Sequence, residues 1–118
     1  MPGSETALGP WDIVKVPFPY TSGAIQQFRP ALIISIGLPV DAPFFIWVLM
    51  ITSAANRPWT GDVGISELEI AGLPVPSVVR TDKVATVEIS KAERIGRLVA
   101  DDKVAVTSRL QRVLQSVL

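Results

Sequence analysis

Two polar residues stand at the borders of apolar segments of the sequence. Arg29 precedes a proline at the start of the run PALIISI, and Thr52 lies near the end of the run FFIWVLMITS. A guanidinium group can bind two phosphate oxygens at once, and a threonine hydroxyl can donate a hydrogen bond to another. The two side chains therefore suit the binding of a phosphodiester and the stabilisation of negative charge on its oxygens.

A second polar pair, Arg80 and Asp82, lies two positions apart on an expected strand, so both side chains should face the same side of the sheet. Asp82 is a candidate acceptor for the proton of a hydroxyl nucleophile, although an ordinary aspartate has a pKa of about 3.9; alternatively, it orients Arg80. Taken alone, such a pair is more often a surface ion pair that contributes roughly 0–1 kcal/mol, and Thr52 is ordinary strand composition.

The sequence contains no histidine and no cysteine. This excludes a Ser-His-Asp triad, a Cys-His pair, a histidine zinc site and acid–base catalysis by histidine. Carboxylates, arginine, lysine, hydroxyls and backbone groups are left for any catalysis. Basic and acidic residues number 11 each, so any contact with nucleic acid must use a local patch rather than bulk charge.

The elements that position these residues are predicted to be short strands followed by one helix. Hydrophobic residues make up 48% of the 118, enough for one domain over residues 1–118, with a loose tail over residues 1–10. The longest apolar run, residues 44–51, is too short to span a bilayer, and the start of the chain lacks the pattern of a signal peptide. We therefore expect a cytoplasmic protein without membrane contact.

Residues 44–53 are apolar on both faces and predict a central strand buried on both sides, with Trp47 in the core. Trp11 and Trp59 are expected in the core or at an interface, or else as platforms for RNA bases. Further strands are expected over residues 12–19 (ending at Pro17 or Pro19), 30–36, 77–83 and 84–90, the last two either joined or separated by a bend. A strand or mixed element is expected over 61–70, with loops over 20–28 and 54–60, a turn over 37–43, and a turn or short helix over 94–98.

The last segment changes to helical spacing. Asp101 or Asp102 is placed to cap the start of this helix and suits its dipole. One helix face collects Val106, Leu110, Val113, Leu114 and Val117. The pattern as a whole predicts a mainly β protein, a small and partly open β-barrel with a C-terminal helix packed against it.

Five segments, in order and at suitable spacing, resemble the MazF/PemK family of toxins from type II toxin–antitoxin systems. Each segment is common on its own, and the ordered set is what makes the resemblance specific. The segments are DIVKVPFPYT (12–21), RPALIIS (29–35), MITSA (50–54), AGLPVPSVVRTDKV (71–84) and IGRL (95–98). The resemblance implies a small SH3-like, CcdB-like β-barrel with a C-terminal helix, and a homodimer.

The resemblance also implies an activity, the cleavage of single-stranded RNA at short preferred sequences, for which no metal and no other cofactor is expected. The 2′-hydroxyl attacks its neighbouring phosphate, which leaves 2′,3′-cyclic phosphate and 5′-hydroxyl ends. Carried onto this chain, Arg29 and Thr52 are the expected catalytic residues, and Ser53, Arg80 and Asp82 are expected to contact RNA. A cognate antitoxin is expected to lay its C-terminal segment across the dimer and cover the RNA groove.

The sequence departs from the family pattern at two places. Trp11 precedes Asp12, where the family usually has glycine, and Gln27 and Phe28 precede Arg29, where the family is often basic. Less charge beside the groove should weaken the attraction of phosphate, and Phe28 is instead a candidate for stacking on a base.

Other functions of the same fold stay open at this point. The CcdB toxin binds DNA gyrase through a helix that ends Trp-Gly-Ile, whereas this chain ends QSVL. A non-catalytic toxin that binds antitoxin or RNA is a second possibility, and a peptide-binding SH3-like module is a third. Replacing Arg29 with alanine separates them, because only a ribonuclease should lose cleavage of RNA.

Overall fold

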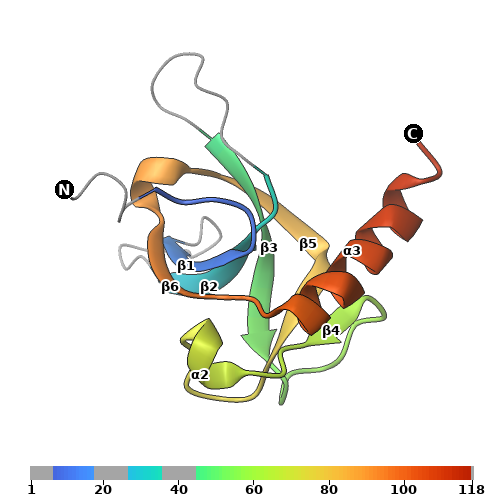
Figure 1. Ribbon diagram of the computed structural model, residues 1–118, viewed down its shortest axis with the longest axis horizontal. Coiled ribbons are helices and arrows are strands. Elements are labelled where there is room, and N and C mark those ends of the chain that lie inside the picture. The colour runs from blue at the N-terminus through green and yellow to red at the C-terminus, as the bar shows by residue number, and fades with distance from the viewer. Residues whose placement is uncertain (1–6, 18–26, 36–44, 118) are drawn as a thin grey trace.

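The computed structural model describes residues 7–17, 27–35 and 45–117. Within these residues six strands form one antiparallel sheet in the order β4-β5-β3-β2-β1-β6 (Figure 1). The elements are β1 (Asp12–Pro17), β2 (Phe28–Ile33), β3 (Phe45–Ser53), β4 (Asp62–Gly64), α2 (Leu68–Ala71), β5 (Ser77–Glu88), η1 (Ile89–Lys91), β6 (Glu93–Arg97) and α3 (Ala100–Leu114). The predicted mainly β fold with a C-terminal helix is confirmed.

The sheet is curved but not closed, since β4 and β6 are its edges in the described part of the chain. The short helix α2 follows β4 and packs against β6 across the opening. Gly96 allows this contact, because a Cβ there would lie 2.3 Å from the carbonyl oxygen of Ala71. The predicted barrel is therefore an open, curled sheet whose two edges approach each other through α2.

One prediction on the strands needs revision. Residues 94–98, predicted as a turn or short helix, mostly form β6, because this segment pairs with β1 at the edge of the sheet. The two strands expected over 77–83 and 84–90 are joined, one of the two predicted alternatives, into the long strand β5, with an irregularity where Leu49 faces Val84 and Met50 faces Arg80. The mixed element over 61–70 is β4 followed by the start of α2. Residues 18–26 and 36–44, which include the second predicted end of β1 and the turn over 37–43, lie outside the described residues.

The core is split between the two faces of the sheet, since neighbouring residues of a strand point to opposite sides. Burial on both faces, predicted for residues 44–53, is confirmed only for residues 48–51 of β3, and Phe45 is exposed at its start. Trp47, however, is 57% exposed, so its assignment to the core is wrong. Ile46 and Val48 take the inward positions on either side of it, and Trp47 points to the opposite face.

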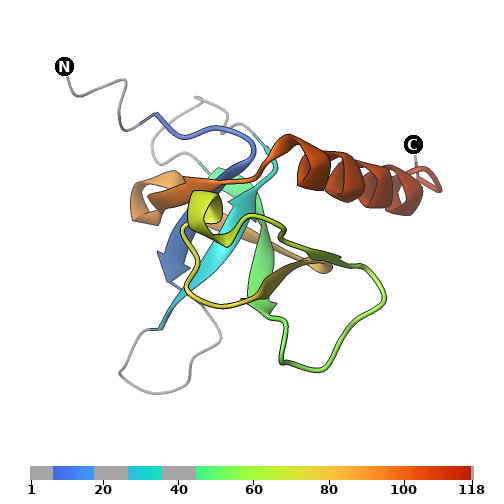
Figure 2. The ribbon, with the colours of Figure 1, turned by 60° about the horizontal axis from the view of Figure 1, so that its bottom comes forward.

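Helix α3 starts at the predicted place without the predicted cap. Its first flanking residue is Val99, which makes no capping bond, and Asp102 instead accepts hydrogen bonds from the amide and hydroxyl of Ser66, both at 2.9 Å. This bond ties the helix to the segment before α2. On the apolar face Val106 is fully buried and Leu110 packs against the core, whereas Leu114, the last residue of α3, is 45% exposed where the helix extends beyond the sheet (Figure 2). Val117, predicted on the same helix face, follows the end of the helix and is 76% exposed.

Residues 7–10, part of the predicted loose tail, are held against the fold. Arg94 donates to the carbonyl of Ala7 and to Asp12, and Asp12 also accepts from the amide of Gly9 at 2.9 Å. Trp11 follows with a φ of 78°, a left-handed conformation that favours glycine. Its ring packs against the core, in agreement with the prediction of a core or interface position for Trp11. No helix in the described ranges is long and apolar enough to cross a membrane.

Candidate active site

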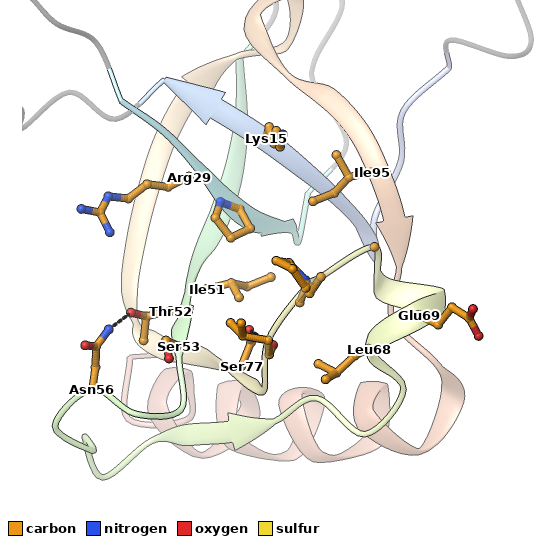
Figure 3. Close-up of a pocket in the computed structure, with 15 residues that line it drawn as sticks. Lys15, Arg29, Ile51, Thr52, Ser53, Asn56, Leu68, Glu69, Ser77 and Ile95 are labelled. Atoms are coloured by element: carbon orange, nitrogen blue, oxygen red, sulfur yellow. Dashed lines mark hydrogen bonds between the residues drawn. The ribbon is translucent and has the colours of Figure 1, made fainter.

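A cleft of about 780 Å³ opens where β2 begins and β3 ends, with α2 on its far side (Figure 3). Its floor is apolar and includes Pro30, Ile51, Leu73 and Ile95. Its polar groups are the side chains of Lys15, Arg29, Thr52, Ser53, Asn56, Glu69 and Ser77. An apolar floor with cations and hydroxyls at its rim suits a ligand that has both planar aromatic rings and negative charge.

The sheet register brings the two predicted catalytic residues to the same wall of the cleft. Strands β2 and β3 are antiparallel, with Ala31 opposite Met50. Continued by two residues toward the start of β2 and the end of β3, this register places Arg29 opposite Thr52. Both residues line the cleft on the same side (Figure 3). Arg29 is exposed and donates to the side-chain oxygen of Gln27 at 3.2 Å. A cation and a hydroxyl are thus presented together at the cleft's rim.

The end of β3 turns sharply back on itself. The amide of Asn56 donates to the carbonyl of Ser53 at 3.0 Å, and the Ser53 hydroxyl accepts from the amide of Ala55 at 3.1 Å. The Ser53 hydroxyl, predicted to contact RNA, therefore also shapes this turn. The turn carries the side chain of Asn56 back to Thr52, and its Nδ2 donates to the Thr52 hydroxyl at 2.5 Å.

Arg80 lies outside the cleft, in a buried cluster behind the loop that follows β3. Its guanidinium donates twice to Asp62, at 3.1 Å each, and once to the carbonyl of Arg57 at 2.8 Å. Its central carbon lies 4.3 Å from the centre of the Trp59 ring. Because the Arg80 and Asp62 side chains are only 11% and 10% exposed, this guanidinium is committed to contacts within the protein.

The pKa of the Asp62 carboxyl reflects this cluster. Burial by itself would raise the pKa, but the hydrogen bonds from Arg80 and from the amide of Trp59, with the positive charge of Arg80, outweigh burial and lower it. Asp62, which sequence reasoning did not single out, is therefore held as a carboxylate between Arg80 and the loop.

Asp82 does not orient Arg80, and that prediction is wrong. Its carboxylate instead lies 3.4 Å from Arg109 of α3. Asp82 and Arg80 separate because β5 is irregular between Arg80 and Val84. Asp82 does not line the cleft, so in this chain it is poorly placed to take a proton from a ligand bound beside Thr52. Phe28 is 59% exposed at the start of β2, next to Arg29 but outside the cleft lining.

A family model describing PemK-like, MazF-like toxins of type II toxin–antitoxin systems matches residues 10–114. The chain belongs to this family. The match covers every strand and helix described here, so the resemblance found in the five sequence segments is confirmed. No curated protein sequence gives a match to the chain.

Solved structures of MazF toxins share the fold. MazF-mt6 of Mycobacterium tuberculosis is 22% identical, with a TM-score of 0.66 over 88% of this chain and 96% of its own. MazF of Deinococcus radiodurans is 22% identical, with a TM-score of 0.65 over 92% and 96%. An endoribonuclease from a mycobacterial species, solved with its cognate antitoxin, is 14% identical, with a TM-score of 0.69 over 92% and 96%.

Four polar residues of the cleft were not predicted from the sequence, namely Lys15, Asn56, Glu69 and Ser77. Asn56 lies in a loop without periodicity, and its proximity to Thr52 depends on the turn at Ser53. Lys15 lies in β1 and faces the cleft from across β2, opposite Pro30 in the sheet register. The alternation of DIVKVP, with Lys15 between two buried valines, was the available signal, because it marks Lys15 as pointing away from one core face.

Proposed function

We propose that this MazF-like toxin is an endoribonuclease that cleaves single-stranded RNA in the cleft between β2, β3 and α2. The observation that carries the proposal is the shared position of Arg29 and Thr52 on one wall of the cleft. A guanidinium and a hydroxyl at one rim are suited to bind the phosphate, while the apolar floor accommodates a base. Family membership and the endoribonuclease described among its structural neighbours support the same activity.

The reaction requires no metal, because the nucleophile is the 2′-hydroxyl of the substrate itself. This oxygen attacks the adjacent phosphorus and loses its proton, and the bond from phosphorus to the 5′-oxygen breaks. The products are a 2′,3′-cyclic phosphate and a 5′-hydroxyl, which takes up a proton. Arg29 balances the charge that develops on the phosphoryl oxygens, and Thr52 donates a hydrogen bond to one of them.

The proton of the 2′-hydroxyl leaves to water in this scheme. Among the described residues that line the cleft, Glu69 is the only carboxylate, and it lies on α2 across the cleft from Thr52 (Figure 3). Lys15 adds a second positive charge to the rim and holds a neighbouring phosphate. Phe28, exposed beside Arg29, stacks on a flanking base.

The proposal extends to partners and location. We expect a cytoplasmic, single-domain protein that forms a homodimer and is inhibited by a cognate antitoxin. Neighbours of the same fold are described as a MazE–MazF pair and as an endoribonuclease with its cognate antitoxin. The exposed apolar residues Val113 and Leu114 at the end of α3, and Val117 just after it, are candidates for burial in such assemblies. Light scattering coupled to gel filtration measures the mass of the assembly.

The deciding experiment is cleavage of a long single-stranded RNA in excess EDTA, with the ends of the products mapped. Wild-type protein should cut at a few recurring sequences and leave cyclic phosphate ends. Arg29→Ala should lower the rate about 10³-fold and Thr52→Ala about 10²-fold, while both variants stay folded. Folded wild-type protein that cuts no RNA at any concentration would refute the proposal and favour a toxin that acts by binding a protein.

A further inference from the structure

The Thr52 hydroxyl has a defined partner in the cleft. Nδ2 of Asn56 donates to Oγ1 of Thr52 at 2.5 Å, and in the described ranges no other hydrogen-bond partner of this hydroxyl is present. A threonine hydroxyl has one hydrogen to donate and two lone pairs that accept. Because an amide nitrogen can only donate, the hydrogen of Thr52 must point away from Asn56.

Asn56 is held at this position by the backbone around it. Its amide closes the turn on Ser53 at 3.0 Å, and the amide of Ala54 donates to the carbonyl of Pro76 at 2.8 Å. The next residue, Arg57, is fixed through its carbonyl by the buried Arg80. These hydrogen bonds anchor the loop, and the anchored loop holds the side chain of Asn56 next to Thr52.

We propose that Asn56 is a positioning residue for RNA cleavage, which keeps the Thr52 hydroxyl turned so that it donates its hydrogen to the phosphate. The inference rests on the proposed function and deepens it. Donors that are aimed before the reaction stabilise a developing oxyanion most effectively, because they need not reorganise as charge appears. Asn56 performs this orientation by occupying a lone pair of the hydroxyl.

The hypothesis predicts that a carboxylate at position 56 lowers the rate of cleavage more than removal of the side chain does. A carboxylate has nearly the shape of the amide but can only accept. Asn56→Asp should therefore reverse the hydrogen bond and draw the Thr52 hydrogen away from the phosphate. Asn56→Ala only releases the hydroxyl to rotate, so we expect the aspartate variant to be the slower enzyme.

The hydrogen bond itself can be observed without activity. Asn56 is the only asparagine in the chain, so labelling with ¹⁵N-asparagine gives a single pair of side-chain amide proton signals. Thr52→Val removes the acceptor and nearly preserves the shape of the side chain. One of the two proton signals should move upfield in this variant, and unchanged signals would overturn the inference.

Single-turnover cleavage at saturating enzyme then tests the role. We expect a rate about 10-fold below wild type for Asn56→Ala and about 100-fold below for Asn56→Asp at pH 8. In the Thr52→Ala background the alanine change should alter the rate less than twofold. Thr60→Ala, an exposed position of the same loop, is the matched control and should cleave like wild type.

The pH dependence separates hydroxyl orientation from simple charge repulsion or loss of structure. A protonated carboxyl can donate as the amide does, and an ordinary aspartic acid with a pKa of about 3.9 is roughly one-tenth protonated near pH 5. The 100-fold deficit of Asn56→Asp relative to wild type should therefore shrink to about 10-fold there, and only when Thr52 is present.

The two proposals fail in different ways. If wild-type protein cleaves no RNA, the proposed function falls and the role of Asn56 falls with it. If wild type cleaves and Arg29→Ala does not, but Asn56→Ala is as active as wild type or equally impaired with and without Thr52, only the role of Asn56 is overturned.

Discussion

The two arginines selected from the sequence lie in opposite environments. Arg29 presents an exposed guanidinium beside Thr52 at the rim of the cleft, whereas Arg80 is buried against Asp62 and beneath the ring of Trp59. A buried guanidinium that already donates to a carboxylate and a carbonyl must lose those bonds before it can bind phosphate. We therefore expect Arg80 to act through the loop it holds and, under the proposed function, Arg29 to be the arginine that meets the substrate.

The largest expected effect that tests this comparison is on stability. Arg80→Ala leaves Asp62 buried without its partner, so we expect the free energy of unfolding to fall by about 3–5 kcal/mol. Arg29→Ala removes an exposed side chain and should change it by less than about 0.5 kcal/mol. Urea unfolding followed by far-ultraviolet circular dichroism measures both. Equal losses in the two variants would mean that the two arginines do not differ in this way.

The sequence placed Arg29 and Thr52 correctly at strand ends because runs of apolar residues reveal where strands begin and stop. It could not assign the partner of Arg80. Asp62 is 18 residues away, and the two meet only through the pairing of β4 with β5. A three-residue strand such as β4 leaves almost no periodic signal.

The same limit explains the other errors. Residues 94–97 form part of strand β6 because they pair with β1, from the opposite end of the chain, and the local sequence does not reveal that pairing. Trp47 was assigned to the core on hydrophobicity, but exposure depends on which face of β3 is covered. The catalytic roles of Arg29 and Thr52 stay predictions until activity is measured.

Smaller changes in the free energy of unfolding are expected when Asp62 and Asp82 are replaced, and they should differ between the two residues. Asp62→Asn removes the charge that pairs with Arg80 inside the protein, and we expect a loss of about 2–3 kcal/mol in the free energy of unfolding. Asp82→Asn weakens only a partly exposed pair with Arg109, so its cost should stay below about 1 kcal/mol. The same urea titrations compare them, and a larger loss for Asp82→Asn would contradict the assignment of Asp62 as the partner of Arg80.

The lowered pKa of Asp62 makes the difference in stability between wild type and Asp62→Asn depend on pH. A carboxyl whose pKa is lower in the folded than in the unfolded protein stabilises the fold above the unfolded pKa, and this contribution is lost as pH falls through the folded pKa. Wild-type stability should therefore decline more steeply than that of Asp62→Asn between about pH 5 and pH 3. Unfolding midpoints across this range test the prediction, and parallel curves for the two proteins would contradict it.

The smallest effect concerns the ring above Arg80. Trp59 is 43% exposed, so its contact with the guanidinium should contribute about 0.5–1 kcal/mol. Trp59→Leu should lose this amount, and Trp59→Phe, which keeps an aromatic face, should lose less. Trp47→Leu is the matched control, since Trp47 is still more exposed. If Trp59→Leu and Trp47→Leu cost the same, the ring adds nothing to the hold on Arg80, and the hydrogen bonds to Asp62 and Arg57 alone fix the loop that carries Asn56.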